Sequence, residues 1–149
     1  MHKIVIMISN QIVMSKKPED TYQWASKLAH ALVPGSIIAL YGELGAGKTC
    51  FVQGLAAGLG IDQPITSPTY TLIHEYHGTT ALYHIDLYRI NSTEEALNLG
   101  LDEYLDGQGI TAIEWAQRAD SLIPPHTIHV YIDAGSEEKE RIITIKTKT

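Results

Sequence analysis

The stretch that decides the fold reads Gly42-Glu43-Leu44-Gly45-Ala46-Gly47-Lys48-Thr49. A glycine, four further residues and then Gly-Lys-Thr match the phosphate-binding loop, or P-loop, at every fixed position. Such a loop works between a buried strand and a helix, and the sequence supplies both. The apolar run at residues 36–41 predicts a strand buried on both faces, and residues 48–59 predict a helix that stops at Gly60.

The residue types in this loop predict how it holds a nucleoside triphosphate. Glycines let the backbone pass close to phosphate oxygens, while the loop amides and the helix N-terminus supply a positive dipole. Lys48 is predicted to reach the β- and γ-phosphates, and the hydroxyl of Thr49 to coordinate Mg²⁺. The expected nucleotide-binding residues of this segment are Gly42, Glu43, Leu44, Gly45, Ala46, Gly47, Lys48, Thr49 and the adjacent Cys50.

Cys50 is the single cysteine of the chain, so no internal disulfide can form and a reducing cytoplasm fits. Its structural interpretation is a small apolar residue in the first turn of a helix. No segment approaches the ~20 apolar residues that a membrane span needs. Residues 1–14 are interpreted as a strand or an N-terminal extension rather than a targeting signal. We therefore expect one cytoplasmic domain over residues 1–149, without membrane contact.

The rest of the chain alternates between strand and helix patterns. An amphipathic helix is expected at residues 20–33, with Asp20 or Thr21 as its N-cap. Ser92 and Glu95 form a capping box that opens a helix to about residue 105. The other expected elements are strands at 69–76 and 80–86 joined by a hairpin at 77–79, a strand at 110–115, a brief helix before Pro124-Pro125, and strands at 127–133 and 141–147.

This order of elements mixes strand–helix units with hairpins. It predicts an α/β fold, a P-loop NTPase-like domain of three layers, in which helices flank a mixed parallel and antiparallel sheet.

Two carboxylates stand where P-loop enzymes place an acid that holds magnesium, at the end of a strand. Asp86 ends the expected strand at 80–86, and Glu114 lies at the end of the apolar run 110–113. Either acid alone would be an ordinary surface residue at a strand end. After a P-loop, we expect at least one of the two to hold magnesium, directly or through water. Asp86 and Glu114 are both candidates for the metal site with Thr49 and for catalysis with Lys48.

Two sequence features, the lack of a guanine-binding element and the small number of arginines, indicate which nucleotide and which reaction to expect. Guanine-binding P-loop proteins carry an Asn-Lys-x-Asp element, which is absent here, so ATP is expected. Small-molecule kinases clamp phosphate with several arginines, whereas this chain has three, none of them clustered. The net charge of −6 argues against tight, unaided nucleic-acid binding. A hydrolase or a nucleotide-dependent switch is favoured.

A second segment carries hydroxyl groups after the P-loop helix. The hydroxyls of Thr66-Ser67-Pro68-Thr69-Tyr70 could sense the γ-phosphate as a switch loop does, or the segment could be a plain turn fixed by Pro68. Histidines are interpreted as ordinary polar residues, except His84, which stands two positions before Asp86.

Four motifs in one order carry a resemblance to a known family. They are Gly-Glu-Leu-Gly-Ala-Gly-Lys-Thr (42–49), Ser-Pro-Thr-Tyr-Thr-Leu (67–72), His-Ile-Asp-Leu-Tyr-Arg (84–89) and Ile-Glu-Trp (113–115). The chain closely resembles the TsaE family, also called YjeE, from about residue 17 to 147. These small bacterial ATPases are needed to form threonylcarbamoyladenosine at position 37 of tRNAs.

The resemblance implies a division of labour. TsaE-like proteins act with two partners, TsaB and TsaD, bind at their heterodimer and hydrolyse ATP to reset the complex. The tRNA is met only indirectly, through that complex. The alternatives are a nucleotide-gated binding module, in which hydrolysis is incidental, and a small-molecule kinase.

The resemblance also implies roles for individual residues. Residues 66–69, with Thr66 and Thr69, would form one switch-like segment, and residues 84–89 a second. Asp86 takes the Walker-B-like place, Glu114 is tied to magnesium or the attacking water, and Trp115 packs beside the nucleotide. Residues 18–21 match the region that contacts the base. The chain departs from the family pattern in its longer N-terminus, in Cys50 after the magnesium ligand, and in Glu-Trp-Ala where Glu-Trp-Pro is usual.

Overall fold

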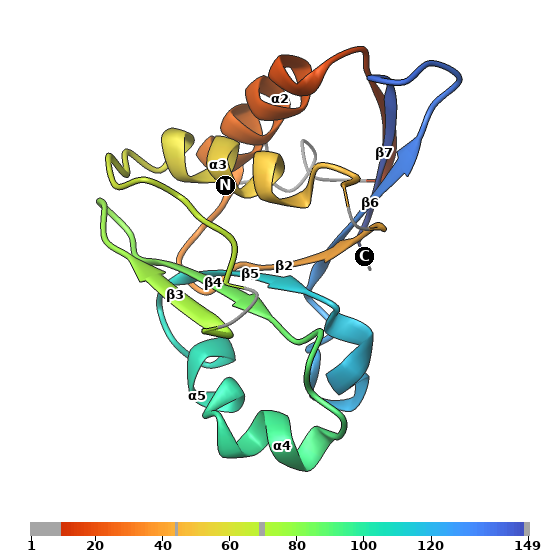
Figure 1. Ribbon diagram of the computed structural model, residues 1–149. Helices are drawn as coiled ribbons and strands as arrows, with labels where there is room; N and C mark the ends of the chain where they lie inside the picture. Colours follow the sequence, from red (N-terminus) through yellow and green to blue (C-terminus); the bar gives the residue numbers. More distant parts are fainter. Residues whose placement is uncertain (1–9, 44, 69–70, 148–149) are drawn as a thin grey trace.

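A seven-stranded sheet organises the computed structural model, which describes residues 10–43, 45–68 and 71–147. The strands lie side by side in the order β1-β7-β6-β2-β5-β4-β3 (Figure 1). Their bounds are β1 Gln11–Ser15, β2 Ile37–Tyr41, β3 Ile73–Tyr76, β4 Leu82–Asp86, β5 Ile110–Glu114, β6 Ile128–Ala134 and β7 Arg141–Lys146.

The centre of this sheet is parallel and its margins are antiparallel. β2 pairs in parallel with β5 and with β6, and β5 pairs in parallel with β4. β3 runs antiparallel to β4 at one margin, and β7 and β1 are antiparallel at the other. The prediction of a mixed sheet is confirmed, and the parallel centre places the carboxyl ends of four strands at one edge.

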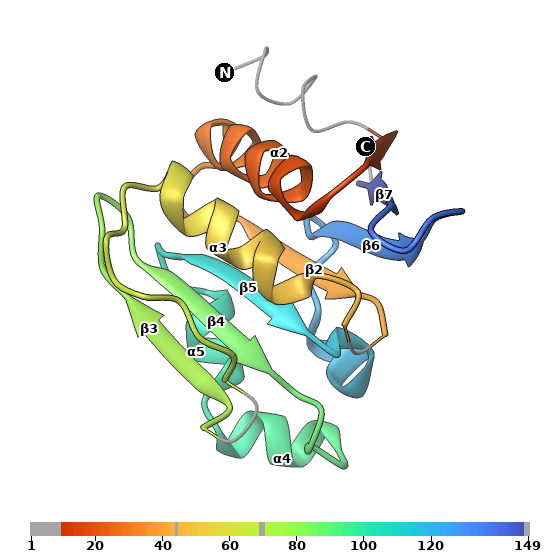
Figure 2. The same cartoon turned by 45° about the horizontal axis from the view of Figure 1, so that its top comes forward.

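Helices cover both faces of the sheet (Figures 1 and 2). α2 (Pro18–Ala31) and α3 (Lys48–Gly58) lie on one face, and α4 (Thr93–Asn98), α5 (Leu101–Leu105) and the 3₁₀ helix η1 (Ala116–Leu122) on the other. The buried apolar residues accordingly form two clusters, one on each face. β2 lies between them, and Ile37, Ile38, Ala39 and Leu40 are all buried. The prediction of three layers is confirmed.

Two glycines let the helices of the first layer approach each other closely. A Cβ atom on Gly54 would collide with the carbonyl oxygen of Tyr22 and with Ala25. A Cβ atom on Gly58, one turn later, would collide with the carbonyl oxygen of Ser26. α3 therefore carries glycine where it touches the backbone of α2, and this contact fixes the helix that follows the P-loop.

Gly54→Ala is expected to destabilise the protein by about 1–3 kcal/mol, the usual cost of overpacking a dense interface. Ala57→Ser, on the exposed side of the same helix, is the matched control and should leave stability nearly unchanged. Denaturant unfolding measures both variants. An unchanged midpoint for Gly54→Ala would show that the two helices can move apart at little cost.

Two expectations about helix bounds are wrong. α2 begins at Pro18 after Lys17 as N-cap, so neither Asp20 nor Thr21 caps it. Proline suits the first turn of a helix because its missing N–H has no helical partner there. Asp20 instead accepts the Lys16 amide (3.0 Å), and the Thr21 hydroxyl pairs with that of Ser15 (2.7 Å).

The helix expected to run to residue 105 is two helices. Ser92 does cap α4, since its hydroxyl accepts the Glu95 amide (3.2 Å). The chain then turns at Gly100, whose φ of 82° lies in the left-handed region and ends a right-handed helix. α5 begins immediately afterwards.

The remaining elements match the sequence with shifted ends. β3 and β4 form the expected antiparallel hairpin, although β3 begins at Ile73. Residues 11–14 belong to β1, paired with β7, which makes part of the N-terminal segment a strand of the sheet. The brief helix before the two prolines is the 3₁₀ helix η1. No helix within the described residues is long and apolar enough to cross a membrane.

Candidate functional site

The P-loop connects β2 to α3 at the carboxyl edge of the parallel strands. Gly45 (φ 81°) and Gly47 (φ 108°) have left-handed backbone conformations that favour glycine, and Gly47 is the N-cap of α3. Glu43 and Ala46 close a turn through the Ala46 amide and the Glu43 carbonyl (3.0 Å). Leu44 lies outside the described residues.

Lys48 is nearly buried, with an exposed fraction of 6%. Its Nζ donates a hydrogen bond to the Gly42 carbonyl (2.7 Å) and lies 3.8 Å from Glu114 Oε1. It also lies 4.9 Å from the centre of the Trp115 ring, within range of a cation–π interaction. The lysine is therefore held over the loop by a carbonyl, a carboxylate and an indole.

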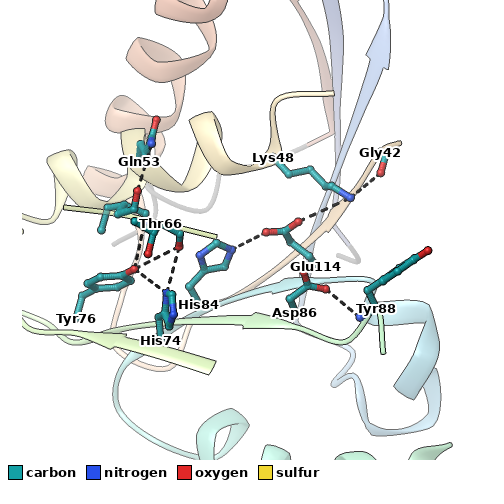
Figure 3. Close-up of polar contacts among 11 residues, drawn as sticks. Gly42, Lys48, Gln53, Thr66, His74, Tyr76, His84, Asp86, Tyr88 and Glu114 are labelled. Atoms are coloured by element: carbon teal, nitrogen blue, oxygen red, sulfur yellow. Dashed lines mark hydrogen bonds and ion pairs between the residues drawn. The ribbon is translucent and has the colours of Figure 1, made fainter. Parts of the chain in front are cut away.

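The two predicted acids stand beside each other. Asp86 ends β4, Glu114 ends β5, and the parallel register pairs the two residues directly. Both are buried, and Figure 3 shows them next to Lys48. Asp86 Oδ1 accepts the backbone N–H of Tyr88 (2.9 Å), and Glu114 Oε2 lies 2.7 Å from His84 Nε2.

Lys48, Asp86 and Glu114 line one cavity of about 350 Å³. Its walls come from the P-loop, the ends of β4 and β5, and the segment before β3, through Gly45, Gly47, Lys48, Thr49, Ser67, Asp86, Tyr88, Glu114 and Trp115. Carboxylate and hydroxyl oxygens are ligands that Mg²⁺ accepts, and Mg²⁺ usually shares its sphere with water and substrate phosphates. Thr49, Asp86 and Glu114 thus fit an ion that arrives with a triphosphate.

Trp115 has a constrained backbone at the edge of this cavity. Its φ of 60° is unusual for a bulky residue, and such conformations persist where the surrounding structure holds them. The indole packs against the ring of Tyr88, with centroids 4.9 Å apart, and against Lys48. The position of the ring suits the predicted contact with a nucleotide.

A second cavity, of about 230 Å³, adjoins the other side of the P-loop. It shares Gly45 and Gly47 with the first cavity and adds Pro18 and Thr21 from α2, the region expected to contact the base. Cys50 also lines it, and its Sγ donates to the Pro18 carbonyl (3.3 Å). Burial raises the pKa of the Cys50 thiol, which keeps the sulfur in its uncharged form.

The segment with hydroxyl groups is only partly placed at the cavity. Ser67 lines it, whereas the backbone of Thr66 is tied to side chains of β3. The Thr66 amide donates to the Tyr76 hydroxyl (3.3 Å), and its carbonyl lies 3.2 Å from His74 Nδ1. Thr69 lies outside the described residues. Nucleotide binding by Thr66 and Thr69 stays a prediction.

Sequence reasoning gave no role to Arg141. From the start of β7, its guanidinium donates to the carbonyl oxygens of Ala46 (3.0 Å) and Gly45 (3.3 Å) in the P-loop. It also donates to the carbonyls of Glu138 and Glu140 beside it. No local pattern marks this residue, because its partners lie 95 and 96 residues earlier.

Asp86→Asn is expected to stabilise the ligand-free protein at neutral pH. Burial, with the charge of Glu114, raises the pKa of Asp86 despite the opposing hydrogen bond from the Tyr88 amide and the charge of Lys48. The folded protein therefore holds this proton more tightly than the unfolded chain does. Ionised Asp86 costs stability, and the cost grows as pH rises from the unfolded pKa of about 3.9 through the folded pKa.

Asparagine keeps an acceptor for the Tyr88 amide and removes that cost. Denaturant unfolding without nucleotide or metal should give Asp86→Asn a higher free energy of unfolding than the parent protein at neutral pH. The difference should vanish in acid. Asp62→Asn, in an exposed loop, is the control. Lower stability of Asp86→Asn at neutral pH would contradict the stated effect of burial.

A strand, a Gly-x₄-Gly-Lys-Thr loop and a helix, with acids ending the neighbouring strands, define the P-loop class of proteins. Within that class, the sequence model of the family described as "Threonylcarbamoyl adenosine biosynthesis protein TsaE" matches residues 15–143. The chain belongs to the TsaE family of tRNA threonylcarbamoyladenosine biosynthesis, as its motifs predicted.

Individual relatives agree with this assignment. The chain is 45% identical to the tRNA threonylcarbamoyladenosine biosynthesis protein TsaE of Treponema pallidum, over 78% of this chain and 87% of that protein. It is 43% identical to the TsaE protein of Bacillus subtilis, over 85% and 80%. The crystal structure of YdiB from the same bacterium superposes with a TM-score of 0.80 at 37% identity, covering 93% of this chain and 86% of that chain.

Proposed function

We propose that this chain binds and hydrolyses ATP with Mg²⁺ as a subunit required for threonylcarbamoyladenosine formation at position 37 of tRNAs. The observation that carries the proposal is the single cavity shared by Lys48, Thr49 and the paired acids Asp86 and Glu114. Membership of the TsaE family supports the role in tRNA modification, and the residues of the cavity support the binding and hydrolysis of ATP.

Each group of the cavity has a part in this hydrolysis. Bound Mg²⁺ would supply positive charge against the charge that develops on the phosphates. Thr49, Asp86 and Glu114 would hold it. Lys48, already aimed over the loop, would contact the phosphates, and Trp115 would pack beside the nucleotide. Glu114 would also orient the attacking water. The triphosphate would cross the loop between the two cavities, with its base toward residues 18–21.

The partners in this proposal are TsaB-like and TsaD-like proteins. The net charge of −6 supports a role in which other subunits hold the tRNA, because phosphate contacts require a basic surface. We further propose that the protein acts in the cytoplasm, where tRNA is modified and where a lone thiol stays reduced.

The test measures phosphate release by the purified protein, with and without TsaB and TsaD from the same organism, and co-purification of the three proteins with and without ATP. Mg²⁺-dependent release that rises with the partners supports the proposal. Nucleotide-dependent assembly, without any need for turnover in tRNA modification, would support a binding module instead. Phosphate transferred to an added metabolite would indicate a kinase.

A further inference from the structure

A buried histidine contacts Glu114 from the neighbouring strand. His84 lies on β4, two residues before Asp86, and its side chain has no exposed surface. Its Nε2 lies 2.7 Å from Glu114 Oε2, and Figure 3 shows the imidazole on the side of the carboxylate away from Lys48. A contact this short between two buried groups constrains both side chains.

The other ring nitrogen shows where the proton lies. His84 Nδ1 is buried and has no hydrogen-bond partner among the described residues. A proton there would bury an unpaired N–H donor, which native structures almost never tolerate, whereas an incompletely satisfied acceptor is more common. The proton therefore belongs on Nε2, and the imidazole donates it to the Glu114 carboxylate.

This hydrogen bond sets the orientation of the carboxylate. Oε2 is occupied by His84, so Oε1 turns toward Lys48, 3.8 Å away. Without that donor, the carboxylate could rotate about its terminal torsion, which is broad for glutamate. Groups that act on a substrate depend on such support, because a misplacement of about 1 Å can cost roughly a hundredfold in rate.

We infer that His84 is a positioning residue, which holds the Glu114 carboxylate in the orientation that hydrolysis requires. The inference rests on the proposed hydrolytic function and extends it to a residue that touches neither nucleotide nor metal. A histidine that only filled the core would be replaceable by an apolar side chain of similar size.

The arrangement itself can be tested without activity. Nitrogen-15 NMR of the imidazole in the ligand-free protein should show His84 with its proton on Nε2 and with a bare Nδ1. A ring that carries its proton on Nδ1 and none on Nε2 would overturn the inference, whatever the protein does with ATP.

Kinetics then test the role. His84→Leu should lower the rate of phosphate release by roughly 10- to 100-fold, the usual effect of losing a supporting hydrogen bond. Its affinity for a fluorescent ATP analogue, measured without Mg²⁺, should stay within about threefold of the parent protein. His84→Gln places Nε2 the same number of bonds from the backbone and should recover most of the rate.

Two further variants test whether His84 acts through Glu114. In a Glu114→Gln background, His84→Leu should have little additional effect, since residues acting through one contact are not additive. His30→Leu, exposed at the end of α2, is the surface control. Parental rates for His84→Leu, or equal losses for the leucine and glutamine variants, would overturn the inference.

The outcomes separate the two proposals. A parent protein that releases no phosphate, even with its partners, refutes the hydrolytic function, while the NMR result still decides the tautomer. If His84→Leu does not fold, the glutamine variant and the NMR measurement decide, because a folded glutamine variant that releases phosphate roughly 10-fold or more slowly than the parent protein would contradict rescue by the donor.

Discussion

Lys48→Ala should abolish tRNA modification in a complementation assay, in which the variant is the only copy of the protein in the cell. In the proposed complex, the ammonium group contacts both the β- and γ-phosphates, and each hydrogen bond to a charged group is worth about 1.5–3 kcal/mol. Loss of two such contacts lowers ATP affinity by roughly a hundredfold or more. Equilibrium binding of a fluorescent ATP analogue measures the loss directly.

The control for this variant must separate binding from folding. Lys48 is nearly buried against Glu114, so its removal also leaves that carboxylate without its cation. The thermal unfolding of ligand-free Lys48→Ala should therefore be measured together with its affinity for the ATP analogue. Lys27→Ala, on the exposed face of α2, should bind and complement normally. Modified tRNA in cells that contain only Lys48→Ala would refute the proposed mechanism.

Glu114→Gln should spare nucleotide binding and slow hydrolysis. A positioned general base typically contributes 10²–10⁴-fold, so a decrease of about a hundredfold or more is expected. Glutamine is the informative change because its amide oxygen can still accept the hydrogen bond from His84. Alanine would leave that buried donor without a partner and add a structural cost.

Binding affinity decides what role this acid has. If Glu114→Gln lowers affinity for the ATP analogue by more than about tenfold, or roughly 1.4 kcal/mol, its role moves from catalysis to binding. Single-turnover phosphate release measures the chemical step. Glu94→Gln, exposed at the start of α4, should match the parent protein in both measurements.

The sequence predicted those residues of the site that belong to a short local motif or stand at the end of a strand. Gly-x₄-Gly-Lys-Thr required a strand and a helix around it, and β2 and α3 lie there. Asp86 and Glu114 each stood at the end of an expected strand, and the parallel register brings them together. A strand-end acid is visible in sequence, because strand length and turn residues are local properties.

Non-local pairing explains what the sequence did not predict. The strand order depends on which backbones meet, and nothing in the β1 pattern indicates that it joins β7. The contact between His84 and Glu114 follows from the relative register of β4 and β5. Gly100 ends α4 inside the segment that was expected to be one helix. Because a single glycine is often tolerated inside a helix, the sequence alone did not indicate its left-handed φ.

The contact of Arg141 with the P-loop has a consequence for the entropy of the proposed nucleotide binding. A trans peptide points its N–H opposite to its C=O, so the arginine that holds the Ala46 carbonyl also turns the Gly47 amide away from itself. Flipping that peptide would break a charged hydrogen bond to a residue on a paired strand. Part of the ordering that an anion receptor needs is thus completed during folding, and such pre-organisation raises affinity without adding any contact to the ligand.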